Sequence, residues 1–172
     1  MAESRMLSNT PTNTNILQPN KHQFIIPDLT STVFFCQSVG LPTVSANEAR
    51  QDTPFLNVNR HPDKMIFDPL NISFELDEDM RNYEEIYNWF RATTGSFGYK
   101  EYGKNTGHFL YHDIILQIHT NTNNPNFKIK YSNGFPISLT APRLEQTTNP
   151  DTILVAEVSF RFDYFVFDRP NT

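Results

Sequence analysis

Three histidines, one cysteine and a run of three carboxylates are the side chains of this sequence with the clearest chemical potential. His108, His112 and His119 lie close together in a segment with the pattern of a strand. Because side chains alternate between the two faces of a strand, His112 and His119 are expected to point to opposite faces. They could not ligate one metal ion without distortion, so ordinary polar or interface roles are favoured over a metal site.

The acidic run Asp77-Glu78-Asp79 could hold a cation, but it lacks the glycine and the terminal glutamate of a calcium loop. Carboxylates also cap helix N-termini, and a helix start explains the run better. Cys36 is the single cysteine, so no internal disulfide can form. It lies in the apolar run Val33–Cys36, where a buried, unreactive thiol is favoured over a nucleophile. No nucleophile elbow, P-loop or dinucleotide-binding glycine motif occurs, so we predict no catalytic residues, no metal and no cofactor.

The composition favours one folded domain that is rich in strands. The chain has 172 residues, among them 15 Phe, 7 Tyr and 1 Trp, and aromatic residues favour strands. The net charge of −5 argues against a nucleic-acid-binding surface, because an acidic surface repels phosphate. No apolar run reaches about 18 residues, so no membrane span is expected, and no signal peptide is expected either.

The elements that must position these residues divide the chain into three parts. Residues 1–21 are polar and without period, which predicts an extended N-terminal arm. The arm is either a floppy end or a segment that orders on a neighbouring subunit, with Ile16 and Leu17 as its apolar anchors. Residues 22–168 form the β domain, and residues 169–172 form a short C-terminal tail.

Strand patterns recur throughout the domain. Strands are predicted over residues 22–26, 31–38, 55–58, 64–67, 71–76, 109–119, 127–131 and 134–139. The first two are separated by a short turn and predict a β-hairpin. Asn133-Gly134 predicts the turn of another hairpin. Residues 44–53 predict a weak edge segment, and residues 59–64 predict a loop.

One amphipathic helix is predicted over residues 79–94. Its apolar side chains share one broad face, which predicts a helix that packs against the core. These side chains are Tyr83, Ile86, Tyr87, Trp89 and Phe90. Asn82, Glu85 and Asn88 are left for the other side.

The C-terminal segment 152–167 has no Gly or Pro, and apolar residues occupy every second position from Leu154 to Val166. As one strand it would span roughly 50 Å, longer than the ~40 Å expected for a domain of this size. It therefore either bends at a bulge or extends beyond its own core to meet neighbours. Alternate residues from 154 to 166 are expected to share a buried face. The exposed face would carry Glu157, Ser159, Arg161 and Asp163.

The glycine-rich segment 95–107 predicts a loop that carries three aromatic side chains, Phe97, Tyr99 and Tyr102. These rings could form the lip of a ligand site. Contact with a partner subunit is the more economical role.

The order of motifs along the chain resembles the tail tube proteins of contractile-tailed bacteriophages and their baseplate-proximal relatives. The resemblance rests on Phe34–Gln37, Leu41-Pro42, Asp52–Phe55, Phe67–Phe74 and Leu76–Trp89, followed by the alternating segment 154–166. It covers most of residues 22–167, and the stretch from Asp77 to Trp89 is the distinctive part.

The resemblance implies a mainly β protein, a β-sandwich or barrel of the tail-tube type. It also implies a virion protein, assembled in the host cytoplasm, whose six copies form a ring. Rings would stack into a tube that guides DNA and the tape-measure protein, with sheath, baseplate or neck proteins as further partners. Glu157, Ser159, Arg161 and Asp163 would line the lumen, and residues 1–21 and 95–108 would contact other rings or the sheath.

Two questions stay open at this level. The same fold serves the main tube, the tube initiator at the baseplate and the terminator at the neck. A different reading is a non-enzymatic β-sandwich module that binds a ligand or a baseplate protein, with residues 95–108 as its binding loop. A small hydrolase is disfavoured because no catalytic constellation is found.

Overall fold

The structure is a computed structural model that describes residues 14–27, 29–94, 110–140, 142–146 and 152–169. Its helices are α2 (Thr30–Phe34) and α3 (Arg81–Thr94). Its strands are β1 (His22–Ile25), β2 (Cys36–Gly40), β3 (Val44–Ala46), β4 (Ala49–Asp52), β5 (Asn57–Arg60), β6 (Met65–Phe67), β7 (Leu70–Glu75), β8 (His112–His119), β9 (Pro125–Leu139), β10 (Val155–Arg161) and β11 (Tyr164–Asp168). The prediction of a mainly β protein is confirmed.

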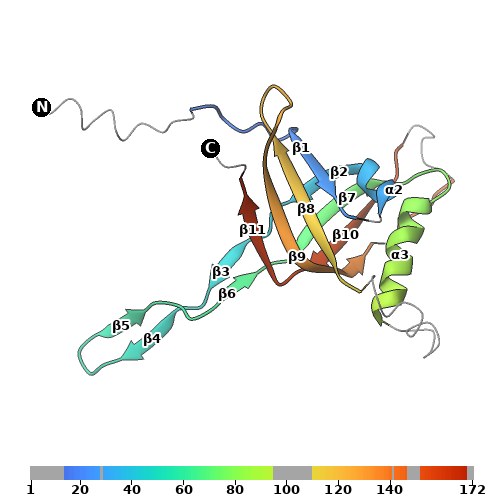
Figure 1. The fold of residues 1–172 in the computed structure, drawn as a ribbon. Coiled ribbons are helices and arrows are strands. Elements are labelled where there is room, and N and C mark those ends of the chain that lie inside the picture. The colour runs from blue at the N-terminus through green and yellow to red at the C-terminus, as the bar shows by residue number, and fades with distance from the viewer. Residues whose placement is uncertain (1–13, 28, 95–109, 141, 147–151, 170–172) are drawn as a thin grey trace, which may run out of the picture.

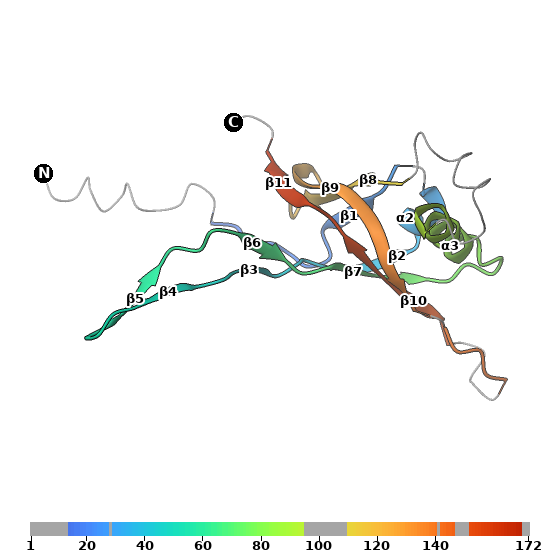
Figure 2. The same cartoon turned by 90° about the horizontal axis from the view of Figure 1, so that it is seen from below.

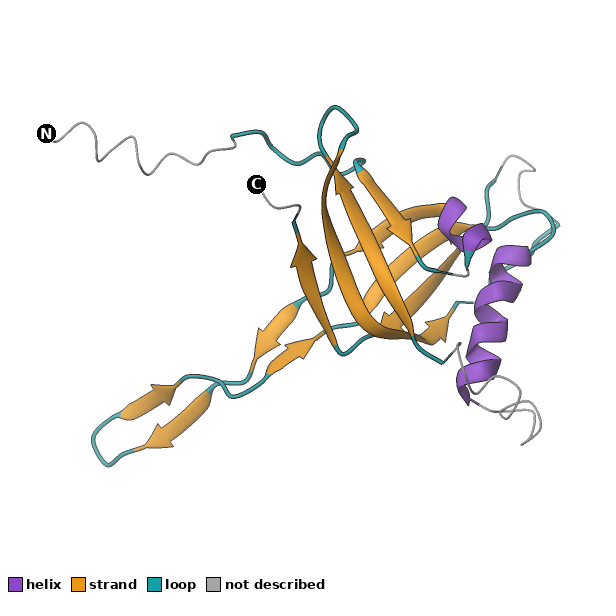
Figure 3. Cartoon of the chain, in the orientation of Figure 1, coloured by secondary structure: helices purple, strands orange, loops and turns teal. Residues whose placement is uncertain are grey.

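Seven strands form one antiparallel sheet that folds over itself. The order is β1-β8-β9-β10-β7-β2, and β11 pairs with β9 beside this path. The first part of β9 pairs with β8 and β11, whereas its last part pairs with β10. The long strand β9 therefore belongs to two layers, which curve around a common core like a partly open barrel (Figures 1 and 3).

Asn133 and Gly134 bend β9 and do not end it, so the predicted hairpin at this dipeptide is wrong. Asn133 has a positive φ of 56°. A Cβ atom on Gly134 would lie 2.6 Å from Ile114 Cδ1 and 3.0 Å from the His112 carbonyl oxygen, which leaves room for glycine alone. The same two residue types that favour a tight turn here produce a corner within one strand.

The C-terminal segment bends at the same corner. β10 ends at Arg161 and β11 begins at Tyr164, and both pair with β9 on either side of its own bend. The Asp163 amide donates to the Ser132 carbonyl at 3.1 Å. Of the two predicted alternatives the bend is observed. It also turns Tyr164 and Val166 outward, each 52% exposed, so they do not continue the buried row.

The predicted hairpin between residues 22–26 and 31–38 is wrong as well. β1 pairs with β8, β2 pairs with β7, and Thr30–Phe34 forms the short helix α2 between them. The Thr32 hydroxyl donates to the Asn82 carbonyl and to the Glu85 carboxylate, both at 3.2 Å. These contacts with α3 hold residues that prefer strands in a helical turn, which shows that tertiary context overrides propensity.

The predicted helix is confirmed as α3, but its buried face differs from the prediction. Asn82, expected on the outer side, is fully buried: its side-chain amide donates to the Glu75 carbonyl at 2.6 Å, and its Oδ1 accepts from the Tyr83 amide. Tyr87, expected in the core, is 46% exposed. A side chain that satisfies several backbone groups of the preceding turn is stable inside, so Asn82 fixes how the helix is rotated.

The core lies between the two layers and under α3. Trp89 stacks on Phe160 of β10 at 5.4 Å between ring centroids and meets the His112 ring edge-on at 4.9 Å. Ile86 and Phe160 are fully buried. A second aromatic group, Phe67, Tyr131, Phe162 and Phe165, fills the corner where β9 and the C-terminal segment bend.

The Tyr131 hydroxyl is buried in this aromatic group and has no hydrogen-bond partner among the described residues. Burial also raises the pKa of Tyr131 to about 12, so the hydroxyl stays neutral at ordinary pH. Removing an unsatisfied buried hydroxyl removes its desolvation cost. We therefore expect Tyr131→Phe to raise the free energy of unfolding by about 1 kcal/mol in urea titration at pH 7. A less stable variant would show that the hydroxyl has a partner in solution.

A long two-stranded arm, distinct from the N-terminal arm of residues 1–21, leaves the barrel where β2 ends and β7 begins. β3 pairs with β6, and further out β4 pairs with β5, so residues 44–67 form a projection that extends away from the barrel (Figures 1 and 2). β5 covers Asn57–Arg60, so the predicted loop over residues 59–64 is partly a strand, and the short strand predicted at 55–58 begins at residue 57.

Candidate assembly surfaces

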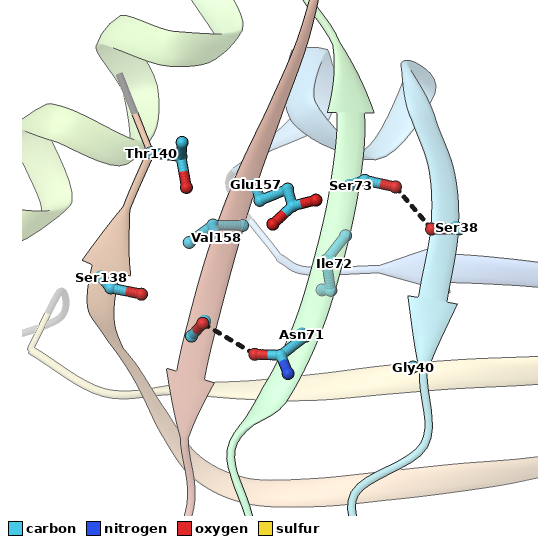
Figure 4. Close-up of a pocket in the computed structure, with 10 residues that line it drawn as sticks. Ser38, Gly40, Asn71, Ile72, Ser73, Ser138, Thr140, Glu157 and Val158 are labelled. Atoms are coloured by element: carbon cyan, nitrogen blue, oxygen red, sulfur yellow. Dashed lines mark hydrogen bonds between the residues drawn. The ribbon is translucent and has the colours of Figure 1, made fainter. Parts of the chain in front are cut away.

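One face of the layer formed by β2, β7, β10 and the end of β9 is polar and points away from the core. It holds a shallow groove of about 480 Å³. The polar groups along it belong to Ser38, Asn71, Ser73, Ser138, Thr140, Glu157 and Ser159 (Figure 4). Ser159 Oγ donates to Asn71 Oδ1 at 2.7 Å, and the hydroxyls of Ser38 and Ser73 are hydrogen-bonded to each other. Among the described residues that line this groove, Glu157 is the one charged side chain.

The four residues predicted for one exposed face are divided among three places. Glu157 and Ser159 lie on the polar groove. The Arg161 Nη1 atom donates to the Phe67 carbonyl at 3.3 Å, which ties β10 to the base of the arm. Asp163 lies in the bend between β10 and β11, where its Oδ2 accepts from Asn133 Nδ2 at 2.7 Å. Because of the bend, Asp163 does not lie on the exposed face that the period-two pattern of the segment predicted for it.

Asp113 and Lys130 form an ion pair of 2.9 Å beside this bend. The hydrogen bond from Lys130 holds the pKa of Asp113 below its usual value, although burial opposes the shift, and the Asn133 amide adds a second bond. A carboxyl with a lowered pKa in the folded state stabilises the fold above its unfolded pKa, and this stabilisation disappears as the pH falls through the folded pKa.

We expect Asp113→Asn to lower the urea midpoint slightly at pH 7, because both groups are largely in water. The difference from the unmodified protein should shrink at pH values below about 4, the usual range of an aspartate. Urea titrations at pH 7 and pH 3 check this expectation. A difference that is equal at both values would mean that the carboxylate charge does not act.

The described strands leave several sheet edges unpaired. β1 has β8 on one side only, β2 has β7 on one side only, and β11 has β9 on one side only. The last part of β9, residues 135–139, pairs with β10 but not with β8. Unpaired edges present backbone donors and acceptors to any neighbouring strand, so they are the natural places for association between copies.

The arm carries a second set of surfaces for association. Its tip exposes Phe55 (99%) and Leu56 (70%), and Met65 is exposed nearer the base. The Thr53 hydroxyl bonds the Leu56 carbonyl and so fixes the turn at the tip. Large apolar side chains exposed at the end of a projection are typical of a protein–protein contact. The sequence contains a signal for the turn at the tip, because Thr53-Pro54-Phe55 separates two extended polar runs.

The five residues predicted to contact other subunits are only partly described by the structure. Ile16 and Leu17 lie in the described segment ahead of β1 and are exposed. Phe97, Tyr99 and Tyr102 lie outside the described residues. The structure therefore adds the arm of residues 44–67 to the candidate contacts.

The chemically suggestive side chains form no reactive centre in the described part of the chain. His112 is buried against Trp89, whereas His119 is on the opposite face of β8. Burial raises the pKa of the Cys36 thiol to about 11, which keeps it protonated at neutral pH. Within the described ranges, no three metal-ligating side chains converge. None of the helices among these residues is long and apolar enough to cross a bilayer.

A family model, described as phage tail tube protein, matches residues 10–168 of this chain. The match spans the N-terminal segment, the barrel, the arm, α3 and the C-terminal bend. Among curated proteins, no sequence matches at a significant level.

Solved structures share the fold at low sequence identity. The cap that terminates the tube of the anti-feeding prophage superposes with a TM-score of 0.67 at 13% identity, covering 99% of this chain and 100% of the other. A chain of the sheath/tube terminator of the extracellular contractile injection system PVC gives 0.65 at 16% identity, with 92% and 99% covered. A chain of the PVC sheath-tube complex gives 0.61 at 15% identity, with 99% of each chain covered.

Proposed function

Since the chain belongs to the phage tail tube protein family, we propose that its copies close into a ring and stack into a structural tube of a contractile tail. The protein is a structural tube-like subunit of the virion tail. Its sheath, baseplate and neck contacts, like the ring itself, are part of this proposal. The lumen of such a tube would let DNA and the tape-measure protein pass.

The proposal of a ring rests on the directions of the strands at the two edges of the polar layer. The order β9-β10-β7-β2 is antiparallel at each step, so β2 and the end of β9 run in opposite directions. A rotation that places β2 of one copy beside β9 of the next therefore continues the same antiparallel pattern. Heterologous contacts of this kind close into a ring when the rotation divides a full turn. We propose six copies per ring.

The polar groove would then face the lumen. Two pairs of its polar side chains, Ser38 with Ser73 and Ser159 with Asn71, are hydrogen-bonded, and Glu157 supplies negative charge. Arg161 is engaged at the base of the arm. The described residues that line the groove include no Lys or Arg to hold phosphate, so a polyanion could slide along it without being trapped. Asp163 lies in the bend between β10 and β11 and would be outside the lumen wall.

The arm would contact the next ring of the stack. It projects beyond the barrel and ends in Phe55 and Leu56, which a single copy leaves in water (Figure 2). Burying these two side chains against another copy would supply several kcal/mol of stabilisation for each contact. The ring and the stack thus use different parts of the chain.

Purified protein tests the proposal directly. Negative-stain microscopy and sedimentation velocity at increasing concentration should show rings and stacked tubes with a central hole. A protein that stays monomeric at high concentration would contradict the proposal and would favour a β-sandwich module that binds a ligand or a baseplate protein. Rings that never stack would favour a terminating or initiating position over the main tube.

A further inference from the structure

A groove follows the free edge of β1 on the side away from β8. Its volume is about 450 Å³. The β1 side is lined by residues 22–26, and the facing side is lined by Thr30, Val33, Phe34 and Cys36. Phe34 stands at the rim and is 81% exposed. The described residues that line the groove include no Asp, Glu, Lys or Arg, so it suits an uncharged, partly apolar occupant.

The backbone of β1 offers open hydrogen-bonding groups to this groove. The Lys21 carbonyl accepts from the His119 amide at 2.9 Å, so residue 21 directs its polar groups toward β8. Residues along an antiparallel strand alternate in this respect. His22 and Phe24 are therefore expected to direct their N–H and C=O groups toward the groove, where an added strand could pair with them.

The segment Thr14–Gln18 has the properties of such a strand. It carries no charged side chain, and it exposes Ile16 (84%) and Leu17 (55%) to water. Five extended residues span roughly 16 Å, which is also the length of residues 22–26 along the groove. The segment and the groove are thus matched in length, in charge and in apolar character.

Pro19 prevents this segment from occupying the groove of its own chain as a tight hairpin. The Lys21 amide bonds the Gln18 carbonyl at 3.3 Å, which closes a four-residue turn with Pro19 in its second position. Proline fixes φ near −65°, whereas the two-residue hairpin turns that keep strands paired need a positive φ there. A bond of 2.7 Å from Lys21 Nζ to Asn123 Oδ1 holds the turn to the barrel. The segment is therefore directed away from its own β1.

We propose that Thr14–Gln18 of one copy adds as a strand along β1 of a second copy and fills the groove between β1 and α2. Ile16 and Leu17 supply its apolar contacts, and Phe34 closes over it. This inference rests on the proposed ring or stack, because a single copy cannot make the contact. It joins neighbouring copies through a third surface, separate from the polar layer and from the arm tip.

Disulfide trapping tests the contact, because Cys36 lines the groove and is the single cysteine of the chain. A Leu17→Cys, Cys36→Ser chain is mixed with unmodified protein under assembly conditions and oxidised with copper–phenanthroline and dissolved oxygen, which takes up the two electrons. The reaction is run at pH 9, since the buried thiol is protonated at neutral pH. Ile16→Cys is tested in parallel, because neighbouring residues on a strand point to opposite faces.

We expect a product of twice the 20.0 kDa chain mass, in which mass spectrometry finds residue 16 or 17 joined to Cys36 of the other chain. The matched control is Leu144→Cys, Cys36→Ser, because Leu144 is another exposed leucine, on a loop. It should cross-link at least about tenfold less, since only docking raises the effective concentration.

Rings without this cross-link, or equal cross-linking of the Leu144 control, would overturn the inference and leave the proposed function standing. In a Leu17→Cys chain that retains Cys36, a purely intramolecular disulfide would overturn it in favour of docking within one chain. Absence of both rings and cross-link would overturn it together with the proposed function.

Discussion

Phe160→Ala is expected to cost about 3–5 kcal/mol of folding free energy, the usual penalty for removing a buried phenylalanine side chain. Phe160 is fully buried on β10, pairs across to Leu70 of β7 and stacks on Trp89 of α3. Its ring therefore joins the central strand to the helix, and neither neighbour can move in to fill the space without leaving its own partners. A loss of this size is a large part of the 5–15 kcal/mol that holds a typical domain together.

Thermal unfolding followed by circular dichroism checks this expectation. The midpoint should fall by about 6–20 °C, given 2–4 °C per kcal/mol for a chain of this length. Phe55→Ala is the matched control, since it removes the same side chain from a position that is 99% exposed. It should leave the midpoint unchanged and weaken assembly alone. Equal shifts for both variants would contradict the assignment of Phe160 to the core.

Removal of the outer arm should abolish tube formation and leave the fold intact. Ala46 and Met65 are paired across β3 and β6, so residues 47–64 can be replaced by Asn-Gly, the preferred two-residue hairpin turn. The deleted part comprises β4 and β5, which pair with each other and leave the barrel strands untouched. The shortened chain keeps the base of the arm, where Phe67 packs against Phe162 and Phe165.

We expect the shortened protein to melt within a few degrees of the full chain and to form rings that do not stack. Negative-stain microscopy and sedimentation velocity measure both properties of the same sample. A full-length chain in which Phe55 and Leu56 are both changed to Ser tests whether the apolar side chains at the tip alone cause stacking. Stacked tubes from the shortened chain would show that rings contact one another through other surfaces.

The parts of the fold that the sequence predicted are those with a clear period and a single buried face. β7 alternates between buried and more exposed side chains from Leu70 to Glu75, and its pattern predicted a half-buried strand. α3 was predicted within two residues of its start, because carboxylates precede an apolar row with helical spacing. Local chemistry determines such elements, so they are visible before any tertiary contact is known.

The errors occur where pairing partners decide between two local solutions. Asn133-Gly134 suits a hairpin turn and a strand corner equally well, and Asp113, Ile114 and Asp163 select the corner. The four side chains of β5 and those of Arg50, Gln51 and Asp52 in β4 are all exposed, so no alternation marks these outer strands. Of the candidate surfaces, the exposed Ile16 and Leu17 could be named in advance, whereas the groove along β1 depends on a helix that propensity disfavours.

The central position of β10 has a consequence for when the protein becomes competent to assemble. β10 lies between β9 and β7 in the sheet, yet it leaves the ribosome after both of them. A growing chain therefore lacks the strand that joins β9 to β7, and the antiparallel order that would meet a second copy does not exist until that strand is inserted. An incomplete chain therefore lacks the pair of sheet edges that a second copy would need. We expect the tube to grow only from subunits whose synthesis is complete.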